Sequence, residues 1–257
     1  MFKNWKQQDS SKKRDYGQYE WTLFEVCLEG VKILGIAALF AYFFYDSVFA
    51  FPLMCIPGFW YLRKRKKEKI RNRKRELVRQ FKECMLSVSA SLQAGYAVEN
   101  AFLESTQDMQ MLFGKQSLIV WELQIIRQGL ILHTSLEILI DDFGKRSHAD
   151  EIKEFAEVFL IAKRGGGNVN EVIVQCAQLI HQKVESDEAI QTMLSSRKFE
   201  QNIMNVMPFI ILFYLESTNK GYFDDLYHSV TGVAIMSVCL MVYCSAYLLS
   251  SKILNQI

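Results

Sequence analysis

The sequence predicts an all-α integral membrane protein in which a cytoplasmic, antiparallel helical bundle lies between two transmembrane hairpins. Two apolar regions predict the membrane segments, one at 31–62 and one divided between 203–215 and 230–249. The residues between these regions contain no proline and place their apolar side chains at helical spacing, which predicts the bundle. Ten Lys or Arg occupy the thirteen positions 63–75, directly after the first region, which places the bundle in the cytoplasm.

Composition divides the chain into four parts. Residues 1–22 form a polar, basic N-terminal segment, and residues 23–62 form the first hairpin. Residues 63–202 form the bundle, and residues 203–257 form the second hairpin. Half of all residues are hydrophobic while 23% are charged, a mixture typical of membrane segments joined to a polar domain. The N-terminal segment is too long and too mixed for a signal peptide, so we expect no cleavage.

Basic residues flank the first apolar region on both sides, which favours an even number of crossings between them. The region exceeds the roughly 20 residues of one span, and Asp46 divides it. We therefore predict one helix that ends near Tyr45 and a second that ends at Leu62. The alternative is one strongly tilted span, which would put five basic residues of the first fourteen on the wrong side of the membrane.

The second hairpin begins with a short apolar stretch that contains Pro208, so we expect its helix to start in the cytoplasm and enter the bilayer unbroken. A loop at 216–228 carries Glu216, Asp224 and Asp225 against a single Lys. Acidic residues outside and basic residues inside are consistent with a loop on the outer side and a cytoplasmic C-terminus.

Six helices are predicted for the bundle, each with one apolar stripe. Thr134 is a candidate N-cap for the fourth, and the sixth starts after Asn168 and continues into the third span. Glycines mark the helix ends: Gly95 after the first helix, Gly114 after the second, Gly144 after the fourth, and Gly165, Gly166 and Gly167 after the fifth.

The apolar stripes give a predicted core for the first five helices. It consists of Ile70, Leu77, Phe81, Met85, Val88 and Leu92; Val98, Ala101, Phe102 and Met109; Leu118, Trp121, Ile125 and Leu132; Leu136, Leu139, Ile140 and Phe143; and Ile152, Phe155, Ala156 and Phe159.

Candidate chemistry is weak, so we expect no enzyme, cofactor or metal. The glycines at 165–167 resemble a phosphate-binding turn, but the Lys-Ser/Thr of such a loop is missing, and a turn between helices explains them. Asp46, Asp224 and Asp225 suggest an aspartyl peptidase, yet all three fall in predicted loops and not in spans. The four histidines have no neighbours at metal-ligand spacing and are expected on the surface or in turns. They are His133, His148, His181 and His228.

The basic stretch, residues 63–75, has the charge to bind nucleic acid, but it lies directly beside a predicted span and has no interleaved aromatic residues. Binding to anionic membrane lipids is therefore favoured over nucleic acid. Its basic residues are Arg63, Lys64, Arg65, Lys66, Lys67, Lys69, Arg71, Arg73, Lys74 and Arg75.

Three segments carry a family resemblance: AGYAVENAF at 94–102, GGGNVNEVI at 165–173 and SSRKFEQNIMNVMPF at 195–209. Together with GYFDDLYHSVTG before the last helix, they resemble the type II secretion system F domain. The order of the parts is most similar to tight-adherence (Tad or Flp) pilus assembly proteins of the TadB and TadC type. The resemblance covers roughly residues 80–257, and the first 60 residues match only in architecture.

By position, the resemblance implies that Gly95, Gly166 and Gly167 are turn glycines and that Arg197 and Pro208 mark the start of the third span. It further implies a non-enzymatic platform in the bacterial inner membrane, with both termini and the bundle in the cytoplasm. Expected partners are a secretion ATPase, pilin or pseudopilin subunits, anionic lipids, and a second platform protein or another copy of this chain.

Two other functions are left open. One is a membrane-embedded aspartyl peptidase of the prepilin-processing kind, and the other is a transporter or sensor subunit. A transporter would be expected to bury polar side chains in mid-bilayer, and the predicted spans carry few beyond hydroxyl groups and Asn205.

Overall fold

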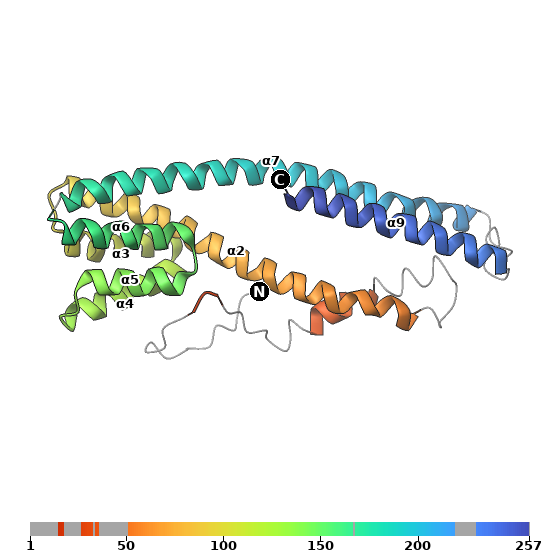
Figure 1. The fold of residues 1–257 in the computed structure, drawn as a ribbon, viewed down its shortest axis with the longest axis horizontal. Coiled ribbons are helices and arrows are strands. Elements are labelled where there is room, and N and C mark those ends of the chain that lie inside the picture. Colours follow the sequence, from red (N-terminus) through yellow and green to blue (C-terminus); the bar gives the residue numbers. More distant parts are fainter. Residues whose placement is uncertain are drawn as a thin grey trace. The chain divides into compact units, whose positions relative to one another are not determined.

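The computed structural model describes residues 15–17, 27–32, 34–35, 51–166, 168–218 and 230–256. Within these residues the secondary structure is helical and contains no strand, which confirms the all-α fold class. Asp46, Asp224, Asp225, His228 and Gly167 lie outside the described residues. The main helices are α2 (Phe51–Gln93), α3 (Val98–Phe113), α4 (Leu118–Ile131), α5 (Leu136–Ser147), α6 (Asp150–Arg164), α7 (Val169–Thr218) and α9 (Val230–Gln256) (Figure 1).

The chain divides into two compact units. The bundle unit comprises Met1–Glu20 and Lys66–Asp187, and the apolar unit comprises Trp21–Arg65 and Glu188–Ile257. Helices α2 and α7 are unbroken and contribute residues to both units. The predicted helix end at Leu62 is therefore wrong, because α2 continues through the basic stretch to Gln93. Lys and Arg are good helix formers, and α2 contains no glycine or proline after Gly58 that would stop the helix.

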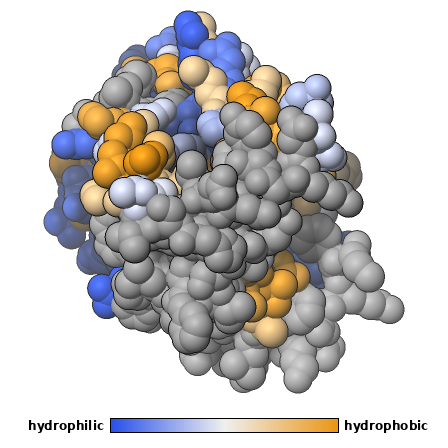
Figure 2. Space-filling view, turned by 90° about the vertical axis from the view of Figure 1, so that its right-hand side faces the viewer, coloured by the Kyte–Doolittle hydropathy of each residue, from blue (hydrophilic) through white to orange (hydrophobic). Residues whose placement is uncertain are grey.

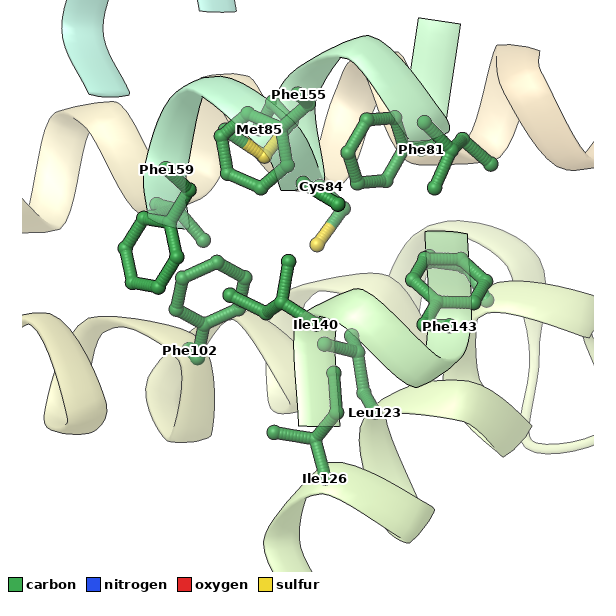
Figure 3. Packing of buried hydrophobic residues seen from close by; sticks show 14 of the residues in the cluster. Phe81, Cys84, Met85, Phe102, Leu123, Ile126, Ile140, Phe143, Phe155 and Phe159 are labelled. Atoms are coloured by element: carbon green, nitrogen blue, oxygen red, sulfur yellow. The ribbon is translucent and has the colours of Figure 1, made fainter. Parts of the chain in front are cut away.

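The core of the bundle unit is built by consecutive helices that pack against one another from α3 to α6, together with parts of α2 and α7. Figure 3 shows aromatic residues of several helices meeting at its centre. The ring of Phe81 lies edge-to-face against Phe143 and Phe155, with centroids 5.9 and 5.5 Å away. The predicted core positions of α3, α5 and α6 are all buried, as are those of α2 except Ile70.

The predicted face of α4 is wrong. Its buried residues are Ile119, Val120, Glu122, Leu123 and Ile126. Leu132 is strongly exposed, whereas Trp121 and Ile125 are half-buried. The buried face of α4 is the one that carries Glu122, its single acidic residue. Hydropathy alone predicts that this charged face is exposed.

Two predicted boundaries of α5 are also wrong. Its N-cap residue is Ser135, one position after Thr134, and no side chain caps it. Gly144 does not end the helix, which continues to Ser147 and is followed by His148 in the left-handed region. Gly144 is buried at the contact with α6, where a Cβ atom would lie 2.9 Å from the Cβ of Ala156.

Other glycines do end helices as predicted. Gly95 and Gly114 follow α2 and α3 with φ of 92° and 80°, and Gly166 follows α6 with φ of 65°. These are left-handed or related conformations that an L side chain adopts only under strain. Gly165 is the C-cap of α6 in an ordinary helical conformation, and its amide donates to the carbonyl of Ile161.

The apolar unit contains an antiparallel pair of helices, the C-terminal part of α7 and α9. Gln201 Nε2 donates to Ser250 Oγ at 2.6 Å, and the hydroxyl of Tyr243 donates to the carbonyl of Asn205 at 3.0 Å. As the residue number rises on α7 it falls on α9, so the two helices run in opposite directions. The ring of Phe209 meets Tyr243 edge-on.

Candidate functional site

The basic stretch lies on one helix. Because residues 63–75 form more than three turns of α2, their charged side chains point in all directions around the helix axis. Arg63, Lys66, Lys67, Arg71 and Arg75 are exposed, and the side chain of Lys64 is outside the description. The remaining basic residues of the stretch are half-buried; they are Arg65, Lys69, Arg73 and Lys74.

Arg73 connects the basic stretch to the chain's N-terminal segment. Its guanidinium carbon lies 5.2 Å from the centre of the Tyr16 ring, which is the geometry of a cation–π contact. Tyr16 is 0% exposed and belongs to the core of the bundle unit. The sequence predicts that residues 1–22 form a separate polar segment, and nothing in it indicates that Tyr16 packs into the core of the bundle unit.

The hydroxyl of Tyr16 reaches a buried carboxylate. It donates to Oε1 of Glu122 at 2.8 Å, and Arg146 donates to both carboxylate oxygens, from Nη1 to Oε1 at 2.9 Å and from Nη2 to Oε2 at 2.7 Å. Glu122 is 1% exposed. Three donors, two of them on the Arg146 cation, therefore replace the water that this carboxylate loses on folding.

Arg146 carries the compensating charge. It comes from the last turn of α5, where a cation also interacts favourably with the helix dipole, and its Nε donates to Asp142 at 2.9 Å. Burial disfavours the charged guanidinium, but its hydrogen bonds and attraction to Glu122 and Asp142 outweigh that effect and raise the pKa of Arg146. The ion pair therefore keeps its positive partner across the pH range in which proteins are folded.

A tight turn holds Tyr16 in place. Oδ1 of Asp15 accepts the amide hydrogen of Gly17 at 2.8 Å and lies 2.8 Å from Nε2 of His148. The hydrogen bond from Gly17 lowers the pKa of the Asp15 carboxyl, and nearby His148 adds to the effect against the opposing influence of burial. A Cβ atom on Gly17 would lie 2.8 Å from the imidazole of His148, so only glycine fits there without displacement.

Acidic side chains on α6 are engaged by lysines of the same unit. Lys183 lies 3.3 Å from Glu151 and 3.7 Å from Glu154, and Lys153 lies 3.8 Å from Glu157. From the sequence, the acids around Asp150, Glu151, Glu154 and Glu157 are only a guess for the contact with a partner ATPase, and the alternative is a plain solvated face. Their pairing makes part of this face electrically neutral, and the guess stays a prediction.

The two residues expected at the start of the third span lie on α7. Arg197 is exposed and lies 3.3 Å from Glu200, and Pro208 is inside the unbroken helix. Proline has no amide hydrogen, so the carbonyl of Met204 loses its helical donor. At the neighbouring carbonyl, that of Asn205, the hydroxyl of Tyr243 supplies a hydrogen bond from α9.

The apolar unit presents large hydrophobic side chains to its surroundings. Ile210, Ile211 and Phe213 of α7 are more than half exposed, as are Val238 and Met241 of α9. Figure 2 shows hydrophobic side chains on the outside of the molecule, beside hydrophilic ones. Among the described helices, the stretch Ala234–Lys252 of α9 is the one with the length and composition to cross a membrane.

The described residues offer little for bond chemistry. A cavity in the bundle core is lined by Phe81, Cys84 and Glu122, among other side chains, but its volume of about 10 Å³ is too small for a substrate. Burial raises the pKa of the Cys84 thiol to about 12, so this thiol is a poor nucleophile. Within the described ranges no three His, Cys, Asp or Glu side chains are placed to hold a metal ion.

Sequence analysis identified the basic stretch and most turn glycines but not the buried network. One signal pointed to it: Glu122 is the single charged residue in the run LIVWELQII at 118–126. A charge inside an apolar helix is typical of either a solvated face or a buried ion pair, and only the position of Arg146 decides between them.

No protein-family model, curated protein or solved structure matches the chain.

Proposed function

We propose that this chain is a multi-pass platform protein in the inner membrane of a bacterium. It couples a cytoplasmic secretion ATPase to the extraction and assembly of pilin subunits in a Tad- or Flp-type pilus, or in a related type II secretion machine. The proposal starts from the resemblance of residues 80–257 to the type II secretion F domain, and the contacts below support it.

The observation that carries the proposal is the continuity of α7. Its N-terminal part supplies Ile173 and Ala177, both 0% exposed, to the core of the bundle unit. The same helix ends in the apolar unit with Ile210, Ile211 and Phe213 exposed. At 1.5 Å per residue, its 50 residues span about 75 Å. An unbroken helix can transmit force from a soluble domain to membrane segments, which is the task of a platform.

The membrane location is supported by the surface of the apolar unit. Exposed apolar side chains on two paired helices suit a hydrocarbon environment, and the hydrogen bond from Tyr243 to the Asn205 carbonyl joins the two helices by polar groups that would otherwise face lipid. The basic stretch of α2, next to the apolar residues 51–62, suits anionic headgroups on the cytoplasmic side. The four-span topology and both cytoplasmic termini are part of the proposal.

The test is to break α7 between its two parts. Ser186 and Asp187 are exposed residues at the end of the bundle unit, so Ser186→Pro with Asp187→Pro interrupts the helix without removing core contacts. In cells that depend on this chain for pili, we expect the double variant to reach the membrane fraction in normal amount and to assemble no pili.

The matched control is Ser186→Ala with Asp187→Ala, which keeps the helix and should assemble pili normally. Normal pili from the proline variant would contradict the proposal. Replacing Asp46, Asp224 and Asp225 together with Asn separates the platform from a peptidase, because a platform leaves prepilin processing intact.

A further inference from the structure

We propose that residues 15–17 form an intramolecular latch. The latch is an Asp-Tyr-Gly turn that docks into a socket of the bundle unit, formed by Arg73 of α2, Glu122 of α4, and Arg146 and His148 at the end of α5. It is a detachable contact between the chain upstream of the first apolar region and the helical bundle, and it does not depend on the proposed platform function.

Tyr16 binds the socket through three different contacts. Its hydroxyl donates to Glu122 at 2.8 Å, its ring faces Arg73 at 5.2 Å, and its amide donates to the carbonyl of Arg146 at 3.1 Å. The side chain is fully buried by residues more than 50 positions away in sequence. A single aromatic residue with both an apolar and a polar partner is a typical anchor for a docked segment.

The residues on either side of Tyr16 fit the socket as well. Asp15 meets His148 at 2.8 Å, and the absence of a side chain on Gly17 leaves room for the imidazole. Two residues of the turn therefore have specific partners in the socket and the third leaves space for it, which distinguishes docking from an incidental contact of one tyrosine.

The socket is completed by the latch. With Tyr16 in place, Glu122 is 1% exposed. Without Tyr16, Oε1 of Glu122 keeps only Arg146 as a donor, and the carboxylate becomes accessible to water. The face of Arg73 that Tyr16 covers is then free for other ligands. Because Arg73 belongs to the basic stretch, closing the latch covers one of its cations, and opening the latch exposes that cation again.

Hydrogen exchange on the purified full chain in detergent tests the latch without any pilus. We expect Tyr16→Ala to accelerate amide exchange in residues 119–126 and 140–148 about tenfold or more, because the loss of a hydrogen bond to a charged group shifts local opening by that order. Tyr16→Phe keeps the ring and should give an intermediate acceleration.

The control is Tyr96→Ala, which removes a half-exposed tyrosine of the same unit and should leave exchange in both segments unchanged. Equal effects of Tyr16→Ala and Tyr96→Ala would overturn the latch. A photo-reactive benzophenone side chain at position 16 shows which part of the chain lies next to this position. Cross-links to α4 or α5 within a monomer support the proposal. Covalent dimers or no cross-link would contradict it. Either result leaves the platform proposal to its own test.

Discussion

At the residue scale, Glu122 and Arg146 form an ion pair in which two hydrogen bonds join the guanidinium to a carboxylate that is 1% exposed. A carboxylate and a guanidinium lose several kcal/mol of hydration each when they are buried, roughly the amount that their mutual attraction and hydrogen bonds recover. The pair is therefore a small net contribution to stability as long as both partners are present. Removing one partner leaves the other charge buried without compensation.

We expect Arg146→Met to destabilise the bundle unit by about 3–5 kcal/mol, because it isolates the Glu122 carboxylate. The measurement is the urea-unfolding free energy of the full chain in detergent, followed by circular dichroism. The control is the adjacent Lys145→Met, which removes an exposed ion pair with Asp141 and should lower the unfolding free energy far less, because water screens that pair. Equal losses for the two variants would show that Glu122 is not held by Arg146.

At the scale of elements, glycine determines how closely α5 and α6 approach. Gly144 lies opposite Ala156, and both are buried. The contact leaves no room for a Cβ at 144, since the two Cβ atoms would be 2.9 Å apart. The helices must separate, or one must shift along the other, to admit even one methyl group.

Gly144→Ala tests this contact. A better helix former replaces glycine, which favours folding by about 1 kcal/mol, but overpacking costs about 1–3 kcal/mol. We expect the change to be about 1–2 kcal/mol more destabilising in the natural sequence than in an Ala156→Gly background, where the space exists. Unfolding free energies of the four proteins in this double-mutant cycle give the answer. An interaction energy of zero between the two substitutions would contradict the close contact, because it would mean that the helices are far enough apart to admit the methyl group.

The elements also show where sequence reasoning succeeds. The apolar stripes of α3, α5 and α6 are narrow, so their period fixes the buried face. Helix α4 is apolar nearly all round, so the spacing of its apolar residues does not determine which face is buried. The charge of Glu122 then favours the prediction that its face is exposed, which is wrong. The sequence wrongly predicts that Gly144 ends α5, because a glycine at a close helix contact and a glycine at a helix end look alike in sequence.

The candidate site follows the same rule. Composition alone reveals the basic stretch, since ten cations in thirteen positions need no partner to be noticed. The network of Tyr16, Glu122 and Arg146 joins residues that are up to 130 positions apart, and no local pattern connects them. Long-range polar contacts depend on how helices pack, which hydrophobic periodicity does not specify.

At the scale of the whole molecule, the two units differ in what their surfaces suit. The bundle unit has its own apolar core, whereas the apolar unit exposes hydrophobic side chains along α7 and α9. We propose a bilayer as the environment of the second surface. Cys239, an exposed residue of α9 within Ala234–Lys252, reports on it directly.

In native membranes opened on both sides, we expect a variant that keeps only Cys239 to resist a charged maleimide, because hydrocarbon excludes the reagent and disfavours the reactive thiolate. A variant with its only cysteine at Ser186→Cys, an exposed site of the bundle unit, should react readily. Denaturing detergent should make the two variants react alike. Rapid labelling of Cys239 before denaturation would place this part of α9 in water.

The position of Tyr16 near the beginning of the chain sets the order in which parts form during synthesis. Two of its partners, Glu122 and Arg146, are made 106 and 130 residues later. At about 5–20 residues per second, the ribosome needs roughly 6–26 s to bridge that distance. Tyr16 therefore stays undocked while α2, α3 and α4 leave the ribosome. It can dock only after α5, which carries Arg146, is complete.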